Sequence, residues 1–442
     1  METLIKVSQF ILSLSFLIVL HELGHFIPAK LFKTRVEKFY LFFDYKFSLF
    51  KKKIGETTYG IGWIPLGGYV KISGMIDESM DTEQLKEEPK PWEFRSKPAW
   101  QRLIIMLGGV TVNFILGILI YIMILNVWGE DYVATTDVKN GFSVPQIFEK
   151  YGFENGDQIL RVNDQQPFNV MSVNKELFLR DVQNIEVKHP GGITEKINLP
   201  EDIGLTMWTN GIMEPFVPRF NAVLDSIIPD TPAAKSGLKN SDKIIAINGN
   251  SIQYWDEFTT AIQNNIDHKQ MTLTVLRNGN NISINVTPAE DGKIGVSPFI
   301  NDVVKYNHKN YSFSESVPKG TLKAYWTLRD YIAQFKYVFT KKGATALGGF
   351  GTILSIFPNK WDWHRFWGLT AFLSIMLAFM NLLPIPALDG GHVVFTLYEM
   401  ISGRKPSDKF LEKAQIVGFI FLITLLLYAN GNDVYKWITG KF

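Results

Sequence analysis

The sequence predicts a polytopic α-helical membrane protein of about four transmembrane helices, with small α+β domains inserted between the second and third. Its 442 residues exceed one ordinary domain, and its apolar residues gather in a few long runs separated by polar stretches. That uneven pattern is typical of membrane spans joined to soluble domains. The runs cover residues 4–27, 100–128, 366–385 and 416–428, the last being short unless its flanks extend it.

The first run reaches the length of a span, which takes ~20 residues, only if the His and Glu inside it are tolerated. A cleaved signal peptide is the alternative for an apolar run at this place. Its amino end carries only Lys6 as a base, and no small-x-small cleavage site follows it. We therefore expect this run to stay in the protein as a transmembrane helix.

Basic residues near the ends of the runs predict the orientation, because positively charged flanks are retained in the cytoplasm. The bases are Lys30, Lys33, Arg35 and Lys38 after the first run, Arg95, Lys97 and Arg102 before the second, and Arg404, Lys405, Lys409 and Lys413 between the third and fourth. Both short connections are then cytoplasmic. Both termini and the polar region from about 129 to 365 are expected on the outer side.

Composition excludes several classes of partner and site. The net charge is only +2, so no strong attraction to nucleic acid is built in, and we expect no nucleic-acid partner. The chain has no Cys, which excludes disulfides, a cysteine nucleophile and thiolate metal ligands. Any metal must therefore be held by His and carboxylate.

Two histidines stand four residues apart in the first run, in the stretch HELGH at 21–25. On a helix, His21 and His25 lie side by side and can share one metal ion. Glu22 lies beside them, where it can take a proton from an attacking water. Ionisable residues cost about 2.5–3.5 kcal/mol each in a span, so they usually mark a function. We therefore favour a metal site over histidines that are merely satisfied within a helix bundle.

A catalytic zinc site with two histidines needs a third protein ligand and leaves one position open. Asp389 is the best candidate, in the stretch NLLPIPALDGGH at 381–392. Pro384 and Pro386 break the third apolar helix before it, and irregular backbone at membrane depth is tolerated where it lines a cavity. The alternatives are that Asp389 belongs to a simple surface turn, or that His392 is the ligand.

The polar middle of the chain contains a stretch similar to a PDZ domain. Residues 221–298 predict short strands around two helices, with the pattern "SGL…D.I..ING" at its centre. Residues 151–167 resemble the same unit again, without its Pro-Ala-Ala start. Two tandem PDZ-like domains follow. Residues 321–340 predict an amphipathic helix that lies on the outer membrane surface or packs against the PDZ-like domains.

With HELGH in the first span, NLLPIPALDGG in a late span and PDZ-like domains between them, the chain resembles the site-2 protease family, in particular its bacterial members with tandem PDZ domains. The resemblance covers nearly the whole chain. It implies that His21, His25 and Asp389 bind Zn²⁺, that Glu22 is the catalytic base, and that Asn381 helps to hold the substrate.

Two further segments resemble family features. Residues 62–71, GWIPLGGYVK, are similar to the family's re-entrant β-hairpin, and residues 108–113, GGVTVN, to the Gly-and-Asn motif of its second span. One departure is the stretch LGGFGTI at 347–353, where family members often have a Gly-Pro motif. A role for that loop is therefore not carried over.

A helical substrate must be unwound before its carbonyls can be attacked, because they are tied up in hydrogen bonds. We expect a membrane-associated β-hairpin at about 57–71 to pair with the unwound segment as an added strand, although a purely structural hairpin is the alternative. The predicted substrate-binding residues are Asn381, Gly67, Gly68, Tyr69, Val70, Lys71 and Asn113.

These observations predict the following division of the chain: 1–128 for the first two spans with HELGH and the hairpin, 129–219 for the first PDZ-like domain, 220–300 for the second, 301–365 for a linker with the amphipathic helix, and 366–442 for the last two spans. The PDZ-like pair is expected on the periplasmic side of a bacterial inner membrane. The active site is expected near the cytoplasmic side.

The resemblance implies a zinc metalloprotease of regulated intramembrane proteolysis. Its expected partners are the lipid bilayer and single-span substrates such as anti-sigma factors and remnant signal peptides. One competing reading is a PDZ-bearing membrane scaffold with a vestigial metal site. A metal-ion transporter is disfavoured, because the second run has no Asp, Glu, Lys, Arg or His between Gly108 and Asn126 to form an ion path.

Overall fold

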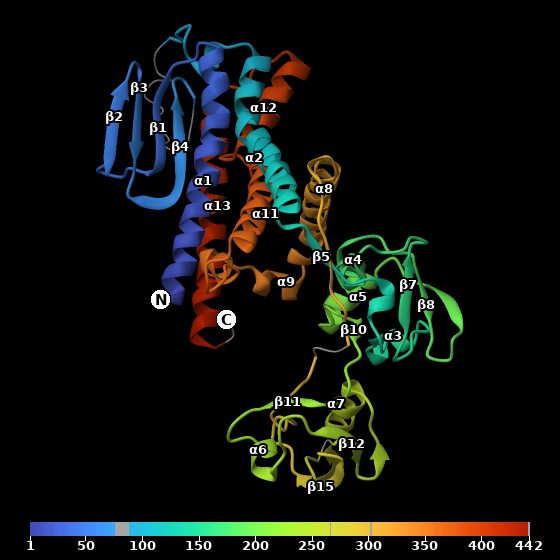
Figure 1. Ribbon diagram of the computed structural model, residues 1–442. Helices are drawn as coiled ribbons and strands as arrows, with labels where there is room; N and C mark the ends of the chain where they lie inside the picture. Colours follow the sequence, from blue (N-terminus) through green and yellow to red (C-terminus); the bar gives the residue numbers. More distant parts are fainter. Residues whose placement is uncertain (76–87, 266, 301–302, 441–442) are drawn as a thin grey trace. The chain divides into compact units, whose positions relative to one another are not determined.

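A computed structural model describes residues 1–75, 88–265, 267–300 and 303–440 (Figure 1). The chain forms two compact units. Unit 1 is Met1–Gly129 with Asn310–Phe442, and unit 2 is Glu130–Lys309. The predicted insertion is therefore visible as a separate body between the second and third apolar helices.

Among its described residues, unit 1 contains four helices that are long and apolar enough to cross a membrane, and they correspond to the four predicted runs. They are α1 (Glu2–Leu31), α2 (Ala99–Trp128), α11 (Trp363–Leu382) and α13 (Asp408–Ile438). The helix α2 begins directly after Pro98, a residue suited to a helix start, and ends at Gly129 with φ +65°. The helix α13 is longer than predicted, because the polar residues on both sides of its apolar run continue the helix.

The centre of unit 1 is α2, which contacts α1, α8 (Phe313–Val338), α11 and α12 (Asp389–Ser402) (Figure 1). It crosses α1 at very close range. A Cβ added at Gly24 would overlap the backbone of Gly108, and one added at Gly108 would overlap the backbone of Gly24. Small residues at a helix crossing allow two backbones to approach within the membrane. This crossing brings α2 directly beside the HELGH turn.

The predicted amphipathic helix of residues 321–340 corresponds to α8, which packs against the spans of unit 1. Its capping box, Ser312 with Glu315, fixes its start. It lies against the spans of unit 1: Thr327 donates a hydrogen bond to the Tyr121 hydroxyl of α2 at 3.2 Å, and the Tyr331 ring makes edge contacts with Phe372 of α11. These contacts join α8 to the spans, while Leu322, Tyr325 and Ile332 of the same helix stay exposed.

Beside α1 lies a four-stranded sheet of order β2-β3-β1-β4 (Figure 1). The strands are β1 (Val36–Phe43), β2 (Phe50–Ile54), β3 (Thr57–Ile61) and β4 (Ile64–Ile72). The predicted hairpin of residues 57–71 is wrong in its pairing, because β3 and β4 do not pair with each other. Both pair with β1, β3 in parallel and β4 antiparallel. The correction matters for the site, since β4 is an edge strand of the sheet that the described residues form.

Unit 1 also contains short helices. They are η2 (Phe94–Ser96), α9 (Lys341–Ala346) and α10 (Phe350–Ser355). Residues 347–353, which lack the expected Gly-Pro motif, lead into α10. The buried Asp433 of α13 accepts hydrogen bonds there from the Gly349 and Thr352 backbone N–H groups.

Unit 2 begins and ends in one small ladder, because β5 (Glu130–Tyr132) pairs with β17 (Asn307–Lys309). Its first half holds a three-stranded sheet, β7-β8-β9, with helices α3, α4 and α5. The core is aromatic, with Phe148, Phe153 and Phe216 buried against one another. The elements are β6 (Phe142–Ser143), α3 (Gln146–Glu149), β7 (Gln158–Val162), η3 (Thr135–Asp137), η4 (Val170–Ser172), α4 (Val173–Leu179), β8 (Asn184–Lys188), β9 (Thr194–Asn198), α5 (Ile203–Asn210) and β10 (Val217–Pro218).

The second half of unit 2 holds a four-stranded sheet of order β13-β12-β14-β15, with Phe258 of α7 buried in its core. The helix α6 starts with Pro232 and ends at Gly237 with φ +80°, as the PAAKSG stretch predicts. The elements are β11 (Leu224–Ile227), α6 (Pro232–Ser236), β12 (Lys243–Ile247), β13 (Asn250–Ser251), α7 (Trp255–Gln263), β14 (Met271–Arg277), β15 (Asn280–Val286) and β16 (Val296–Pro298).

Candidate metal centre and active site

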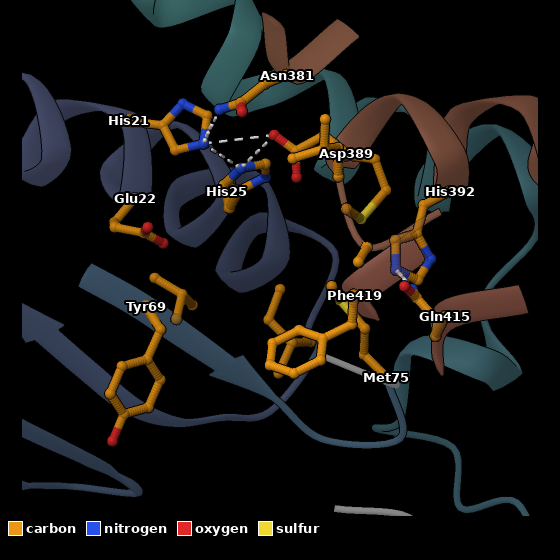
Figure 2. Close-up of a pocket in the computed structure, with 15 residues that line it drawn as sticks. His21, Glu22, His25, Tyr69, Met75, Asn381, Asp389, His392, Gln415 and Phe419 are labelled. Carbon is orange, nitrogen blue, oxygen red and sulfur yellow. Dashed lines mark hydrogen bonds and ion pairs between the residues drawn. The ribbon is translucent and has the colours of Figure 1, made fainter. Parts of the chain in front are cut away.

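The two histidines of HELGH lie on one face of α1, as their spacing predicts. Their rings are 4.8 Å apart between centroids, and their Nε2 atoms are 3.3 Å apart (Figure 2). The side chain of His25 is only 8% exposed and that of His21 only 13%. The two imidazole rings are therefore largely buried, with their Nε2 atoms close together.

Asp389, which comes from the far end of the chain, lies beside the two histidines. It is the first residue of α12, which starts a new helix immediately after the proline-containing segment. Gly390 and Gly391 allow that start, because added Cβ atoms would run into the backbone of residues 382–386. The carboxylate atom Oδ2 lies 3.3 Å from Nε2 of His21 and 3.3 Å from Nε2 of His25.

These three atoms form an equilateral triangle whose size fits a zinc ion. Zinc ligands at about 2.0–2.1 Å in a tetrahedron lie about 3.3–3.4 Å from one another, which matches the three separations of 3.3 Å. The buried Oδ2 of Asp389 also has no hydrogen-bond partner among the described residues. A buried carboxylate oxygen without a donor needs a cation. Two imidazoles and one carboxylate are a ligand set that suits catalytic zinc.

The Nδ1 atom of His25 fixes the orientation in which this ring could bind a metal. His25 Nδ1 lies 2.8 Å from the carbonyl oxygen of Ile105 in α2, so Nδ1 carries the proton and donates it. The lone pair of Nε2 is then free for a metal. The close crossing of α1 and α2 thus determines which nitrogen faces the site.

Glu22 lies beside the triangle, between α1 and the edge strand β4 (Figure 2). Its carboxylate accepts a hydrogen bond from the backbone N–H of Val70. Gly68 brings the strand this close, because a Cβ there would meet Ile18 and would lie 3.7 Å from Cγ of Glu22. The predicted base and the predicted substrate strand are therefore in direct contact.

Asn381, near the end of α11, reaches the site from the opposite side. Its Nδ2 atom lies 3.2 Å from Nε2 of His21. His392, the rival ligand, points elsewhere: its Nε2 is 2.5 Å from Nε2 of Gln415 in α13 (Figure 2). The structure thus brings Asp389, and not His392, to the histidine pair.

A cavity of about 90 Å³ opens onto the triangle. It is lined by His21, Glu22, His25, Tyr69, Val70, Ile72, Met75, Met106, Asn381, Ala387, Leu388, Asp389, His392, Gln415 and Phe419. Ala387 has φ +77°, so the segment that forms this wall is held in a strained backbone conformation.

The remaining predicted residues lie near the site without lining the cavity. Gly67 packs near the Phe43 ring, Gly68 faces α1, and Lys71 pairs with Glu37 at 3.6 Å. Asn113 contacts the His21 ring with its side chain. The sequence prediction missed the apolar lining residues, which are Ile72, Met75, Met106, Ala387, Leu388 and Phe419, and the polar Gln415. The local signals for them were the proximity of residues 387 and 388 to Asp389 and that of Ile72 to Lys71.

Comparison with known proteins decides the family, because the profile of peptidase family M50 matches residues 9–425 of this chain. The chain belongs to peptidase family M50. The resemblance to the site-2 proteases is thereby confirmed, and the protein is a membrane metalloprotease of this family.

Curated relatives match over nearly the full length. The chain is 27% identical to the "Regulator of sigma E protease" of Haemophilus influenzae, over 99% of this chain and 100% of that protein. It is 26% identical to the "Regulator of sigma-E protease RseP" of Escherichia coli, over 96% of this chain and 97% of that protein. It is 25% identical to a "Putative zinc metalloprotease" of Thermotoga maritima, over 96% and 98%.

Proposed function

We propose that the protein hydrolyses peptide bonds within the transmembrane segments of single-span membrane proteins. The observation that carries this proposal is the coincidence of three features at one cavity: the ligand triangle of His21, His25 and Asp389, the carboxylate of Glu22, and the free edge of β4. When bound, zinc would supply Lewis-acid activation of water and of the scissile carbonyl.

The chain's own groups divide the remaining work. Glu22 takes a proton from the attacking water and returns it to the leaving amine. Asn381, whose amide lies 3.2 Å from the zinc-facing nitrogen of His21, is positioned to donate to the oxygen of the substrate carbonyl. Tyr69 and Val70 border the cavity, where an extended substrate segment would lie.

The edge of β4 provides a template for that extended segment. Because the Val70 N–H points to Glu22 and away from β1, alternation along the antiparallel pair places the backbone groups of Gly68 on the same free edge. A substrate unwound into a strand can pair there, which holds its carbonyl beside the site. This assigns the added-strand role to Gly68 within the predicted stretch 67–71, while the Val70 N–H holds the carboxylate of Glu22.

The substrates and the membrane orientation belong to the same proposal. Two relatives are named for regulation of sigma E, which supports anti-sigma-factor-like proteins as substrates, alongside remnant signal peptides. We place the active site near the cytoplasmic face of a bacterial inner membrane and unit 2 on the periplasmic face. The positive residues that flank the apolar helices support this orientation.

Unit 2 is proposed to be two PDZ-like domains that act as a size filter. Two successive sheet-and-helix bodies and the PAAKSG helix that ends at Gly237 support the PDZ assignment. As a filter, the pair would admit substrates whose outer domain has already been trimmed.

The test compares purified wild-type protein with Glu22→Gln in detergent, on a panel of single-span substrates, with and without a chelator. We expect Glu22→Gln to keep its zinc and to cleave about 10²–10⁴-fold more slowly, because the proton acceptor is lost. The chelator should abolish wild-type cleavage. Full activity of Glu22→Gln would instead favour a scaffold with a vestigial metal site.

A further inference from the structure

Asn113 is the polar residue of α2 that lies closest to the histidine pair, and it is completely buried. The crossing of α1 and α2 at Gly24 and Gly108 holds it there, one helical turn beyond Gly109. Its backbone oxygen accepts a hydrogen bond from Ser374 of α11 at 2.7 Å. This hydrogen bond joins α2 and α11 at the backbone and does not involve the Asn113 side chain.

The hydrogen-bonding capacity of the His21 ring limits how Asn113 can be oriented. Nδ2 of Asn113 lies 3.2 Å from Nδ1 of His21, and Nδ2 of Asn381 lies 3.2 Å from Nε2 of the same ring. A neutral imidazole carries one proton, so it can accept a hydrogen bond at only one of its two nitrogens. One of the two amides must therefore present its oxygen, which a half-turn about the last side-chain bond achieves.

The geometry of the triangle decides which amide is turned. Nε2 of His21 is the nitrogen that faces Asp389 and His25, so it must be free of a proton to bind a metal. The proton then sits on Nδ1, which needs an acceptor. As placed, the buried Oδ1 of Asn113 has no hydrogen-bond partner among the residues that the structure describes. The half-turn places this oxygen opposite Nδ1.

We propose that the side-chain oxygen of Asn113 accepts a hydrogen bond from Nδ1–H of His21, and that Asn113 is a positioning residue of the metal centre. It holds His21 in the tautomer and ring orientation in which Nε2 can bind zinc, as the Ile105 carbonyl does for His25. The inference rests on the proposed zinc site. It gives Asn113 a role at the metal instead of the substrate contact predicted for it.

The experiment measures the zinc affinity of the full-length protein in detergent by competition with a chromogenic chelator. Asn113→Leu keeps the size of the side chain and removes the acceptor, and we expect it to bind zinc about 10–100-fold more weakly. Asn113→Asp keeps an acceptor oxygen and should stay within a few-fold of the wild type. Ser374→Ala, which removes the hydrogen bond to the Asn113 backbone, is the matched control and should leave the affinity unchanged.

The thermal midpoint of each metal-free variant shows whether it is folded, and Asn113→Ala replaces the Leu variant if that one does not fold. Wild-type affinity in a folded Asn113→Leu protein would overturn the inference, as would equal losses in the Leu and Asp variants. A wild-type protein that binds no zinc would overturn the zinc site itself. The failure of this inference and the failure of the proposed function are thus distinguishable.

Discussion

At the scale of single residues, Gly109 shows that the metal centre depends on an absent side chain. A Cβ at this position would lie 2.6 Å from Cε1 of His21 and would also overlap the His25 ring. Ala is favoured over Gly in a helix by about 1 kcal/mol, so Gly109→Ala should help α2 by propensity alone. We nevertheless expect it to weaken zinc binding at least about tenfold, because both ligand rings must move. Chelator competition measures the effect.

Gly368 supplies the control for this substitution. It lies in α11, another apolar helix of unit 1, and an added Cβ would meet nothing within 4 Å. Gly368→Ala should therefore leave zinc affinity and cleavage unchanged. Equal effects of the two substitutions would mean that helix stiffness, and not contact with the histidines, determines the outcome.

A second prediction at this scale concerns His189 in unit 2. Burial lowers its pKa, but hydrogen bonds to Asp157 at 2.7 Å and Glu195 at 3.2 Å, with the charge of Glu154 nearby, outweigh burial and raise the pKa above its usual value. A raised folded-state pKa means that protonated His189 stabilises unit 2 fully below about pH 6.5 and that this contribution is lost as the pH rises through the raised value. At low pH this stabilisation of unit 2 is also lost, because Asp157, whose pKa is raised by burial, takes up a proton.

Between the pKa values of Asp157 and His189, we expect the β8 amides of His189→Gln to be less protected from hydrogen exchange than those of the wild type. At alkaline pH the two proteins should be protected about equally. The measurement is hydrogen exchange of the β8 amides in the full-length protein, corrected for the intrinsic effect of pH. A difference between the two proteins that does not change with pH would contradict the charged pair.

At the scale of elements, the free edge of β4 makes the sharpest prediction. Val70→Pro removes the N–H that donates to Glu22 on this edge, while proline is tolerated on an edge strand, so the pairing with β1 should survive. We expect zinc content to stay normal and cleavage of a helical substrate to fall at least about tenfold, the worth of one such hydrogen bond. Val70→Ala keeps the N–H and should retain most of the activity. Equal losses would indicate that the packing of the Val70 side chain matters and that its N–H does not.

The elements also show how far the sequence could be read. The spans and the HELGH pair were predictable because apolar length and an i, i+4 spacing are local signals. The helix α12 was not, because Gly390 and Gly391 read as a turn, whereas the structure needs them to pack α12 onto the preceding loop. The pairing of β3 and β4 with β1 was likewise not readable, since sheet order depends on contacts between distant residues.

The same limit applies inside the site. Asp389 could be proposed as the third ligand because a zinc site with two histidines needs one more protein ligand and the proline-containing segment marked the place. The contact of Asn113 with His21, and that of Gln415 with His392, join residues on different helices. No spacing along the chain encodes such contacts. They follow from the crossing of helices, which only the folded structure displays.

At the scale of the whole molecule, the two units make the filter hypothesis testable without damage to the site. Every residue of the metal centre and its cavity belongs to unit 1, and β5 pairs with β17 where unit 2 begins and ends. Deleting residues 141–297 and joining the ends with a short Gly/Ser linker keeps this ladder as a stem. The shortened protein should bind zinc like the wild type.

If unit 2 screens substrates by size, the deletion should allow cleavage of single-span substrates that still carry a folded outer domain. The wild type should cleave them only after trimming. The comparison measures both proteins on trimmed and untrimmed versions of one substrate, with Glu22→Gln in the shortened chain as the background. A shortened protein that holds zinc but cleaves neither version would contradict the filter, because removing unit 2 would then have admitted no additional substrate. Unit 2 would instead be required to deliver substrates to the active site.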